Sequence, residues 1–263
     1  MNAAFNDDIG WLEELDRISH NFEYSNPQEI LRWALETYGD KLTMATAFGA
    51  EGCIIIDMLA KLRDQTGLLP DLFNLETGYQ FQETLDLRER LIEKYNLPIR
   101  FVSAKETVAQ MEANFGGPIY GSDPNTCCHI RKVVPLKDAL GGFSAWITAI
   151  RRDQTPERKA APIVGPDVKF PHLVKVNPLA NWSKDQVWDY VRAHDVPTNV
   201  LHEQGFPSIG CWPCTRAVAN GEDDRAGRWA GTDKRECGLH IGEDGKMTRI
   251  SKPVEKVAAP VHF

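Results

Sequence analysis

Apolar residues recur along the chain with two different spacings. Over residues 7–38, Trp11, Leu12, Leu15 and Ile18 fall on one face of a helix, which predicts a helical segment. After it, short apolar runs alternate with longer amphipathic stretches. The short runs predict strands at 42–48, 72–75, 99–102, 145–150 and 173–176. The amphipathic stretches predict helices at 53–62, 81–95, 107–115, 133–140 and 187–194.

This alternation of strands and helices predicts an α/β fold, with a doubly wound, mostly parallel sheet covered by helices on both faces. Such sheets bind ligands beyond the carboxyl ends of their strands, so the loops after Phe48, Leu75 and Ile150 are the first candidates. From Gly205 onward the periodicity fades, and Gly, Pro, Cys and Arg become frequent. We therefore expect three parts: an N-terminal helical segment (1–40), an α/β domain (41–205) and an irregular C-terminal segment (206–263).

The composition is that of a globular protein, with 42% hydrophobic and 25% charged residues in a chain of 263. The net charge of −7 provides no positive field toward nucleic acid or a membrane surface, so we expect neither partner. The N-terminus has no signal-peptide pattern, and no run reaches the roughly 18 apolar residues of a membrane helix. We expect a cytoplasmic protein, whose six cysteines are metal ligands or reactive thiols before they are disulfides.

Four of the cysteines form two close pairs, Cys127-Cys128 and Cys211-Trp-Pro-Cys214. Four thiolates can complete one zinc site or one iron–sulfur cluster. Zinc ligands in a pair are usually separated by two to four positions, which adjacent cysteines fit poorly. A cluster has separate irons that can take neighbouring thiolates, so the pattern favours a cluster. A structural zinc, or a redox pair at Cys211 and Cys214, remains open.

Cys237 is the candidate catalytic residue. It stands in Glu236-Cys-Gly-Leu-His240, downstream of Arg225, Arg228, Lys234 and Arg235. Nearby cations favour the thiolate form, which is the nucleophile. The alternative is an inert loop cysteine, which the polar surroundings disfavour. Cys53, by contrast, lies in the apolar run Cys53-Ile-Ile-Ile56, and we expect it in the core.

Two further features suit an anionic ligand. The glycine-bearing run Thr46-Ala-Phe-Gly-Ala-Glu-Gly52 lies at a predicted strand-to-helix junction, where backbone N–H groups can approach an anion. Many such turns carry glycine for steric reasons alone, and this one is not a Walker loop. Basic residues follow predicted elements, and arginine forks suit phosphate and sulfate. The candidates are Arg131, Lys132, Arg151 and Arg152, whereas we interpret Arg158 and Lys159 as solvated.

Taken together, these motifs resemble the sulfonucleotide reductases. Residues 46–52 resemble that family's modified pyrophosphate loop, and Leu75-Glu-Thr-Gly78 resembles its Leu-Asp-Thr-Gly element. The other matching stretches, 127–132, 146–154, 210–214 and 236–240, follow in the family's order, so the resemblance covers residues 41 to 240. The two cysteine pairs mark the cluster-containing branch, which typically reduces adenylyl sulfate instead of its 3′-phosphorylated form. Gly52, Glu76 and Ala149 depart from the usual pattern.

The resemblance implies a HUP-type adenine nucleotide α-hydrolase-like fold, with residues 41–205 as the nucleotide-binding domain. It implies a [4Fe–4S] cluster on Cys127, Cys128, Cys211 and Cys214, with Cys237 as the nucleophile. The implied reaction releases sulfite and AMP in sulfate assimilation toward cysteine, with thioredoxin or glutaredoxin as reductant. The implied substrate contacts are Thr46, Ala47, Phe48, Gly49, Leu75, Thr77, Gly78, Lys132, Arg151, Arg152, Arg225, Arg228 and His240.

The reductant is expected to be a separate protein. Only 26 residues follow Cys237, fewer than the roughly 100 of a small folded domain. Three other functions stay open: a reductase that also accepts the 3′-phosphorylated substrate, an ATP-pyrophosphatase-type ligase with a structural metal on four cysteines, and a non-catalytic metal-binding module. The ligase needs a Ser-Gly-Gly-x-Asp-Ser loop, which residues 46–52 lack. The oligomeric state is open, and a homo-oligomer is compatible with the sequence.

Overall fold

The computed structural model describes residues 9–232, 234 and 239, and its centre is a six-stranded sheet of order β3-β2-β1-β4-β6-β5. All neighbouring strands are parallel except β5 and β6. The predicted α/β class with a mostly parallel sheet is therefore confirmed. The strands are β1 (Leu42–Thr46), β2 (Asp71–Glu76), β3 (Ile99–Ser103), β4 (Ala145–Ile147), β5 (Val164–Pro166) and β6 (Val174–Val176).

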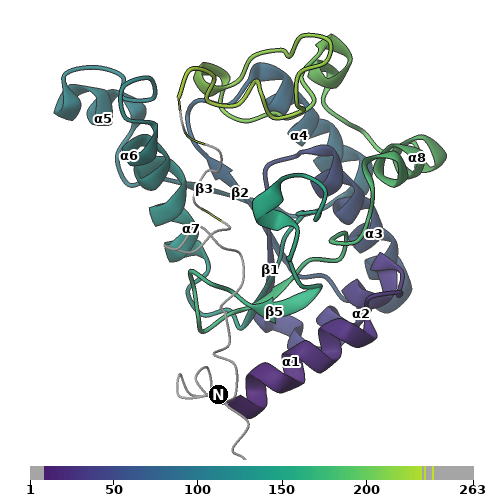
Figure 1. Cartoon of the computed structure of the whole chain (residues 1–263). Coiled ribbons are helices and arrows are strands. Elements are labelled where there is room, and N and C mark those ends of the chain that lie inside the picture. Colours follow the sequence, from purple (N-terminus) through teal and green to yellow (C-terminus); the bar gives the residue numbers. More distant parts are fainter. Residues whose placement is uncertain (1–8, 233, 235–238, 240–263) are drawn as a thin grey trace, which may run out of the picture.

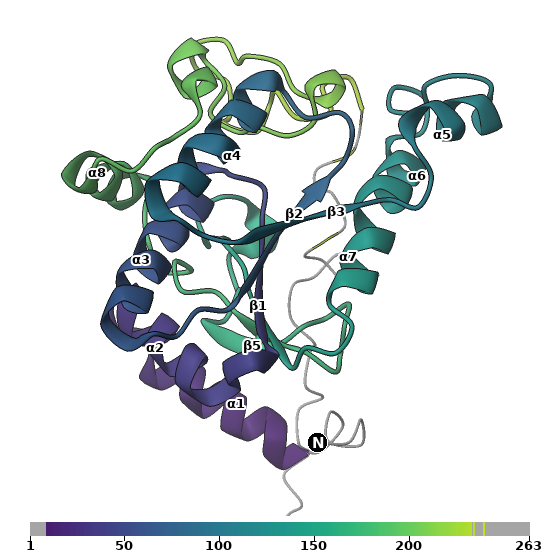
Figure 2. The same ribbon diagram turned by 180° about the vertical axis from the view of Figure 1, so that it is seen from behind.

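Helices cover both faces of the sheet (Figures 1 and 2). On one side α3 packs against α2, α4 and α8, and on the other lie α5, α6 and α7. No described helix is both long and apolar enough to cross a membrane. The helices are α1 (Ile9–Asn21), α2 (Pro27–Tyr38), α3 (Ala50–Thr66), α4 (Gln82–Tyr95), α5 (Val108–Phe115), α6 (Pro124–Cys128), α7 (Val134–Ala139) and α8 (Lys184–His194).

The N-terminal helical segment is two helices, because the chain carries a capping box inside it. The Asn26 side chain accepts a hydrogen bond from the Glu29 N–H at 2.9 Å, and the Glu29 carboxylate accepts one from the Asn26 N–H at 3.2 Å. Pro27 then begins α2 at the position where its missing N–H costs nothing. A second capping box, formed by Ser183 and Gln186, begins α8.

The core of the described residues has two main apolar clusters, beside two minor ones of a few residues each. The larger one joins α2, α3, α4 and α8 to the sheet, and the smaller one gathers around Trp146 and Phe73. Helix α3 is buried along most of its length, and Cys53 within it is fully buried. Burial raises the pKa of the Cys53 thiol, so this cysteine is unreactive. Its predicted place in the core is confirmed.

Strand β5 was not predicted. It consists of three residues, Val164-Gly-Pro166, and pairs antiparallel with β6 at the edge of the sheet. Proline is tolerated there because an edge strand leaves one side of its backbone unpaired. The strand is held by α1, where the Ser19 hydroxyl accepts hydrogen bonds from the N–H groups of Ile163 (3.0 Å) and Val164 (3.3 Å).

Replacing the N-cap of α2 tests the origin of the break between α1 and α2. Asn26→Ala removes the side chain that satisfies the Glu29 N–H, and we expect it to lower the free energy of unfolding by about 1 kcal/mol. Asn26→Asp retains a capping oxygen and should cost much less. The urea midpoint of the two variants measures this. Equal midpoints for both would mean that packing, not the cap, fixes the start of α2.

Candidate functional site

The candidate site lies at the carboxyl edge of the sheet, where the strand order reverses. Strands β2 and β4 lie on opposite sides of β1, so the loops after β1 and β4 diverge and leave a crevice. The segment from Val200 to Thr232, green to yellow in Figure 1, runs across this edge. It divides the crevice into three neighbouring recesses, which we name the cysteine, cationic and polar recesses.

The cysteine recess gathers the four predicted metal ligands from two distant parts of the chain. All four thiols are free. Burial, together with the three neighbouring thiols, raises the pKa of Cys127 to about 12. The recess is lined by Tyr79, Tyr120, Pro124, Cys127, Cys128, Arg131, Lys132, Cys211, Pro213, Cys214 and Trp229.

Cys211 differs from its neighbours in its electrostatics. Burial works to raise the pKa of its thiol, but Lys132, the Thr77 hydroxyl and Arg228 together outweigh it, so that the pKa lies below the ordinary value. The Thr77 oxygen lies 3.4 Å from the Cys211 sulfur. Within the described residues, no set of three or more His, Cys, Asp or Glu side chains is placed to hold a single metal ion.

A π-helical turn, His129–Val133, joins α6 to α7 directly after the tandem cysteines. Such turns are rare and concentrate at functional sites. The turn buries Arg131, whose guanidinium donates to the carbonyl oxygens of Thr77 (2.8 Å) and Glu106 (2.5 Å). Arg131 thus ties the loop after β2 to the cysteine recess. Gly78 in that loop has a φ of +75°, and a Cβ there would lie 2.6 Å from Val108.

The cationic recess has a volume of about 220 Å³ and adjoins the cysteine recess. The two share Lys132, Cys211 and Trp229. Its lining brings together four cations, and the described part of the lining includes no Asp or Glu. The residues are Ala47, Asn74, Leu75, Thr77, Gln80, Thr84, Lys132, Arg158, Ile209, Gly210, Cys211, Arg225, Arg228, Trp229 and Leu239.

Arg228 shows that this recess is suited to an anion. Its Nη1 donates to the Ser208 hydroxyl at 3.2 Å and to the Ile209 carbonyl at 3.3 Å, but its buried Nε has no hydrogen-bond acceptor. A buried donor without an acceptor is costly unless a ligand supplies one. The guanidinium also stacks on Trp229, with its carbon 4.5 Å from the ring centre.

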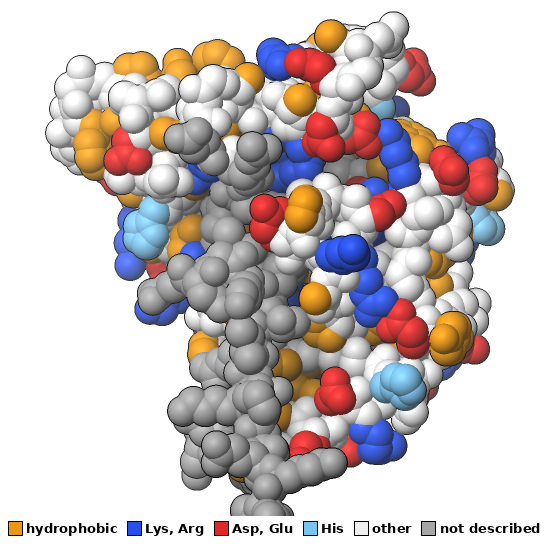
Figure 3. Space-filling view, viewed as in Figure 1, with side chains coloured by type: hydrophobic (Ala, Val, Ile, Leu, Met, Phe, Trp, Pro, Cys, Tyr) orange, Lys and Arg blue, Asp and Glu red, His pale blue; other side chains and the backbone are white. Residues whose placement is uncertain are grey.

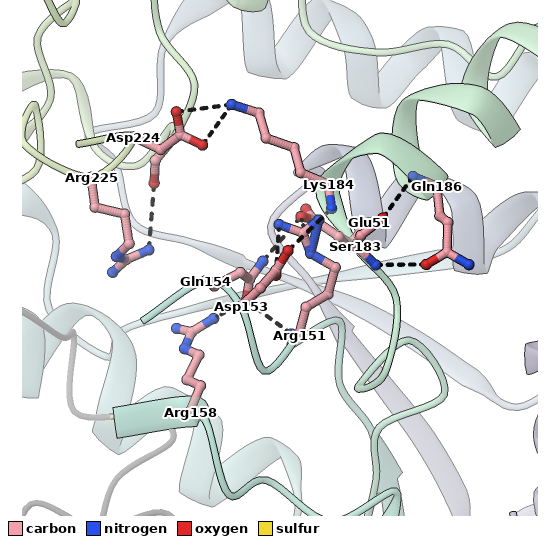
Figure 4. Close-up of polar contacts among 11 residues, drawn as sticks. Glu51, Arg151, Asp153, Gln154, Arg158, Ser183, Lys184, Gln186, Asp224 and Arg225 are labelled. Atoms are coloured by element: carbon pink, nitrogen blue, oxygen red, sulfur yellow. Dashed lines mark hydrogen bonds and ion pairs between the residues drawn. The ribbon is translucent and has the colours of Figure 1, made fainter. Parts of the chain in front are cut away.

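The polar recess, of about 280 Å³, lies beside the cationic recess and shares Ile209, Arg225 and Arg228 with it. Its described lining has four cations and four carboxylates. Figure 4 shows its polar contacts, with Arg151 between Glu51 and Asp153 and with Lys184 reaching Asp224. The lining is Gly49, Ala50, Glu51, Arg151, Asp153, Gln154, Lys184, Val187, Trp188, His202, Pro207, Ser208, Ile209, Asp223, Asp224, Arg225 and Arg228.

Two buried aromatic residues at this edge hold backbone conformations that side chains other than glycine rarely adopt. Phe48 has a φ of +56°, and Trp229 has a φ of +48°. Such strain persists only where the surroundings impose it, and it clusters at functional sites. Around Phe48 the Thr46 hydroxyl accepts from the Phe48 N–H at 3.1 Å. A Cβ at Gly52 would lie only 2.9 Å from that hydroxyl, which accounts for the glycine.

The residues proposed from sequence fall into several groups. Ala47, Leu75, Thr77, Lys132, Arg225 and Arg228 line the cationic recess, and Gly49 and Arg151 line the polar one. Thr46, Phe48 and Gly78 shape the surrounding loops. Cys237 and His240 lie outside the described residues, although Leu239 reaches the cationic recess.

Two arginines are placed differently from what their positions in the sequence suggested. Arg152 donates hydrogen bonds to both carboxylate oxygens of Glu23 and, at 2.8 Å, to the Ala161 carbonyl. It lines neither the cationic nor the polar recess. Arg158 is only 7% exposed and lines the cationic recess, so its interpretation as a solvated cation was wrong. The reason is a 3-10 turn, Pro156–Arg158, which folds the side chain back toward the crevice.

Figure 3 shows one face of the molecule. On its described part, acidic and basic side chains are interspersed and form no continuous positive patch. This agrees with the net charge of −7 and means that any anion is held by specific groups inside the recesses.

A family model and curated relatives of similar sequence point to the same family. The model of the phosphoadenosine phosphosulfate reductase domain matches residues 41–217. The adenosine 5′-phosphosulfate reductase of Staphylococcus haemolyticus is 41% identical over 230 residues, which are 87% of this chain and 93% of that protein. The phosphoadenosine 5′-phosphosulfate reductase of Gloeobacter violaceus is 44% identical over 229 residues, 86% and 93% of the two chains.

A solved structure extends the agreement to three dimensions. The phosphoadenylyl-sulfate reductase of Candida auris, in a phosphate complex, superimposes with a TM-score of 0.67 at 30% identity and covers 78% of this chain and 97% of its own. The predicted HUP-type fold is thereby confirmed together with the resemblance on which it rested. The chain belongs to the phosphoadenosine phosphosulfate reductase family.

Proposed function

We propose that this protein reduces adenylyl sulfate to sulfite and AMP in sulfate assimilation, in the reducing cytoplasm. The observation that carries the proposal is the adjacency of the cationic and cysteine recesses, which share Lys132 and Cys211. Leu239, two residues from Cys237, lines the same cationic recess. In this proposal residues 1–40 support the fold, 41–205 bind the nucleotide and 206–263 carry the catalytic cysteine.

The phosphosulfate of the substrate belongs in the cationic recess. Lys132, Arg225 and Arg228 line it, and Arg158 joins them from the loop after β4. The recess of about 220 Å³ is smaller than the roughly 300 Å³ at the lower end of small-molecule sites, so the nucleoside extends beyond it. The polar recess, continuous with it through Ile209, Arg225 and Arg228, provides that space.

The first chemical step is attack by the Cys237 thiolate on the sulfur of adenylyl sulfate. A sulfur–sulfur bond forms while the bond between that sulfur and the bridging phosphate oxygen breaks, and AMP leaves with the electron pair. The guanidinium and ammonium groups of Arg225, Arg228 and Lys132 meet the negative charge that develops on the leaving phosphate. His240 is proposed to contact the same region. The enzyme then carries S-sulfocysteine at position 237.

The second step needs an external dithiol. Cys53 is buried in α3, and the other four described cysteines share one recess, so none of them is placed as a resolving thiol. A thiolate of thioredoxin or glutaredoxin attacks the Cys237 sulfur and releases sulfite. The partner's second thiol then attacks the mixed disulfide, which regenerates the Cys237 thiolate and leaves the partner oxidised.

The residues that would hold a [4Fe–4S] cluster are Cys127, Cys128, Cys211 and Cys214, which are free and line one recess as two pairs, although they are not placed to hold a single metal ion. A bound cluster would supply a fixed negative charge beside Lys132. We propose that this charge orients the Lys132 ammonium, which lines both recesses, toward the substrate without the cluster changing its oxidation state. The preference for a cluster over zinc rests on the adjacency of Cys127 and Cys128.

The activity is tested by anaerobic sulfite release with reduced thioredoxin, using adenylyl sulfate and its 3′-phosphorylated form in parallel. We expect sulfite mainly from adenylyl sulfate. Comparable rates would instead support the dual reductase, which the 44% identity to the Gloeobacter enzyme keeps open. No sulfite from either substrate, in a preparation with intact cofactor, would refute the proposal and favour the ligase or the metal-binding module.

The role of Cys237 is tested by Cys237→Ser, with Cys53→Ala as the matched control. Because only a thiolate can form the sulfur–sulfur bond, Cys237→Ser should lose sulfite release by at least a thousandfold while still binding AMP in a calorimetric titration. Cys53→Ala removes a buried thiol and should retain turnover. Turnover by the serine variant would show that the nucleophile is another residue.

The cofactor is tested by iron, sulfide and zinc analysis of the purified protein. We expect about four irons and four sulfides per chain and the absorption of a [4Fe–4S] centre. Cys214→Ser should lose the iron, whereas Cys53→Ala should keep it. One zinc per chain and no sulfide would instead identify a structural metal held by the four cysteines. A cluster whose oxidation state followed turnover would contradict the electrostatic role.

A further inference from the structure

Glu51 lines the polar recess from the first turn of helix α3. Helix α3 begins beside the recess with Gly49 as its N-cap, and no side chain caps its first N–H groups. A helix N-terminus of this kind attracts an anion. A negative charge of the protein itself lies near this N-terminus, because one Glu51 carboxylate oxygen is 3.7 Å from where a Cβ of Gly49 would be.

The second feature that would attract a phosphate is Arg151. Its side chain is 7% exposed, and its buried Nε and Nη1 have no hydrogen-bond acceptor. Carboxylates stand on two sides of it: Glu51 lies 3.3 Å from Nε, and Asp153 lies 3.2 Å from Nη2. The guanidinium is therefore neutralised without being saturated by hydrogen bonds.

A network of hydrogen bonds holds the Glu51 side chain in this place. Gln154 donates from its side-chain amide to Glu51 at 3.0 Å and accepts from the Arg151 N–H at 3.0 Å (Figure 4). The Asp153 carboxylate accepts a hydrogen bond from the backbone N–H of Lys184 at 3.1 Å, which connects this network to the start of α8. The carboxylate cannot swing away without breaking these contacts.

We infer that Glu51, supported by Asp153, makes the polar recess select a free ribose 3′-hydroxyl and reject a 3′-phosphate. This inference rests on the proposed function, in which the nucleoside extends from the cationic recess into the polar one. A hydroxyl can donate a hydrogen bond to the Glu51 carboxylate. A phosphate dianion there would meet two carboxylates around a cation that is already neutralised, and like charges at such distances repel strongly.

The two recesses thus treat anions differently although they share Arg225 and Arg228. The cationic recess adds Lys132 and Arg158 to that pair and has no carboxylate in its described lining. The polar recess adds two cations and four carboxylates. A nucleotide with one charged end and one neutral end matches this division, whereas a nucleotide charged at both ends does not.

The test is Glu51→Gln, which removes the charge while keeping the shape. For each protein we would measure kcat/KM for both sulfonucleotides and, by calorimetry, the Kd of AMP and of adenosine 3′,5′-bisphosphate. We expect the preference for the nucleotide without a 3′-phosphate to fall by about tenfold or more in both measurements. Asp153→Asn should change it in the same direction by less, because that carboxylate is 43% exposed.

The matched control is Glu222→Gln, which removes the same charge from a carboxylate that pairs with Arg216 and lines neither the cationic nor the polar recess. The Glu222→Gln variant should prefer the nucleotide without a 3′-phosphate to the same extent as the wild type. The inference is overturned if Glu51→Gln changes the ratio by less than twofold, or if Glu222→Gln changes it equally. If Glu51→Gln does not fold, an unchanged ratio in Asp153→Asn overturns it. If the wild-type protein releases no sulfite, the proposed reaction is wrong. The Kd values of AMP and adenosine 3′,5′-bisphosphate still test the role of Glu51 in that case.

Discussion

The reversal of strand order between β1 and β4 is the constraint on which the site depends. Because β2 and β4 flank β1, the chain leaves β1 and β4 in opposite directions and opens a crevice at the carboxyl edge. The loop after β1 supplies Ala47 to one recess and Gly49 to another, and the loop after β4 supplies Arg151 and Arg158 in the same way. The end of β2 adds Leu75 and Thr77, and the turn before α7 adds Lys132.

Charge compensation then determines what the crevice accepts. A buried guanidinium is stable only with anions or acceptors around it. The fold meets this need with Glu23 for Arg152, with Glu51 and Asp153 for Arg151, and with main-chain carbonyls for Arg131. Hydrogen bonding is incomplete at two of the buried arginines, because Nε of Arg228 and both Nε and Nη1 of Arg151 have no acceptor. Both arginines line the recesses in which we propose that the nucleotide binds.

The sequence predicted elements and motifs better than it predicted side-chain direction. Apolar periodicity located the long helices and the parallel strands, because their burial repeats over many residues. It missed β5, whose three residues carry no periodicity. The capping pattern Asn26-Pro-Gln-Glu29 could have revealed the break between α1 and α2. By contrast, Arg152 and Arg158 exchanged their expected roles, because Arg152 pairs with Glu23 from the N-terminal segment whereas Arg158 is buried in the cationic recess. The tandem cysteines illustrate the same limit, since the π-helical turn that follows them arises from how α6 and α7 join and left no recognisable pattern in the sequence. That turn carries Lys132, which lines the cysteine and cationic recesses at once.

The distribution of thiols also constrains how electrons reach the substrate. Releasing sulfite from S-sulfocysteine requires two electrons, and thiol–disulfide exchange delivers them as a pair. Burial keeps Cys53 protonated, and Cys127 is held among three neighbouring thiols that raise its pKa further. A single cluster usually passes one electron at a time, so it matches this demand poorly. In the proposed reaction, the cysteine recess would therefore contribute charge, and the two electrons would come from a separate dithiol partner.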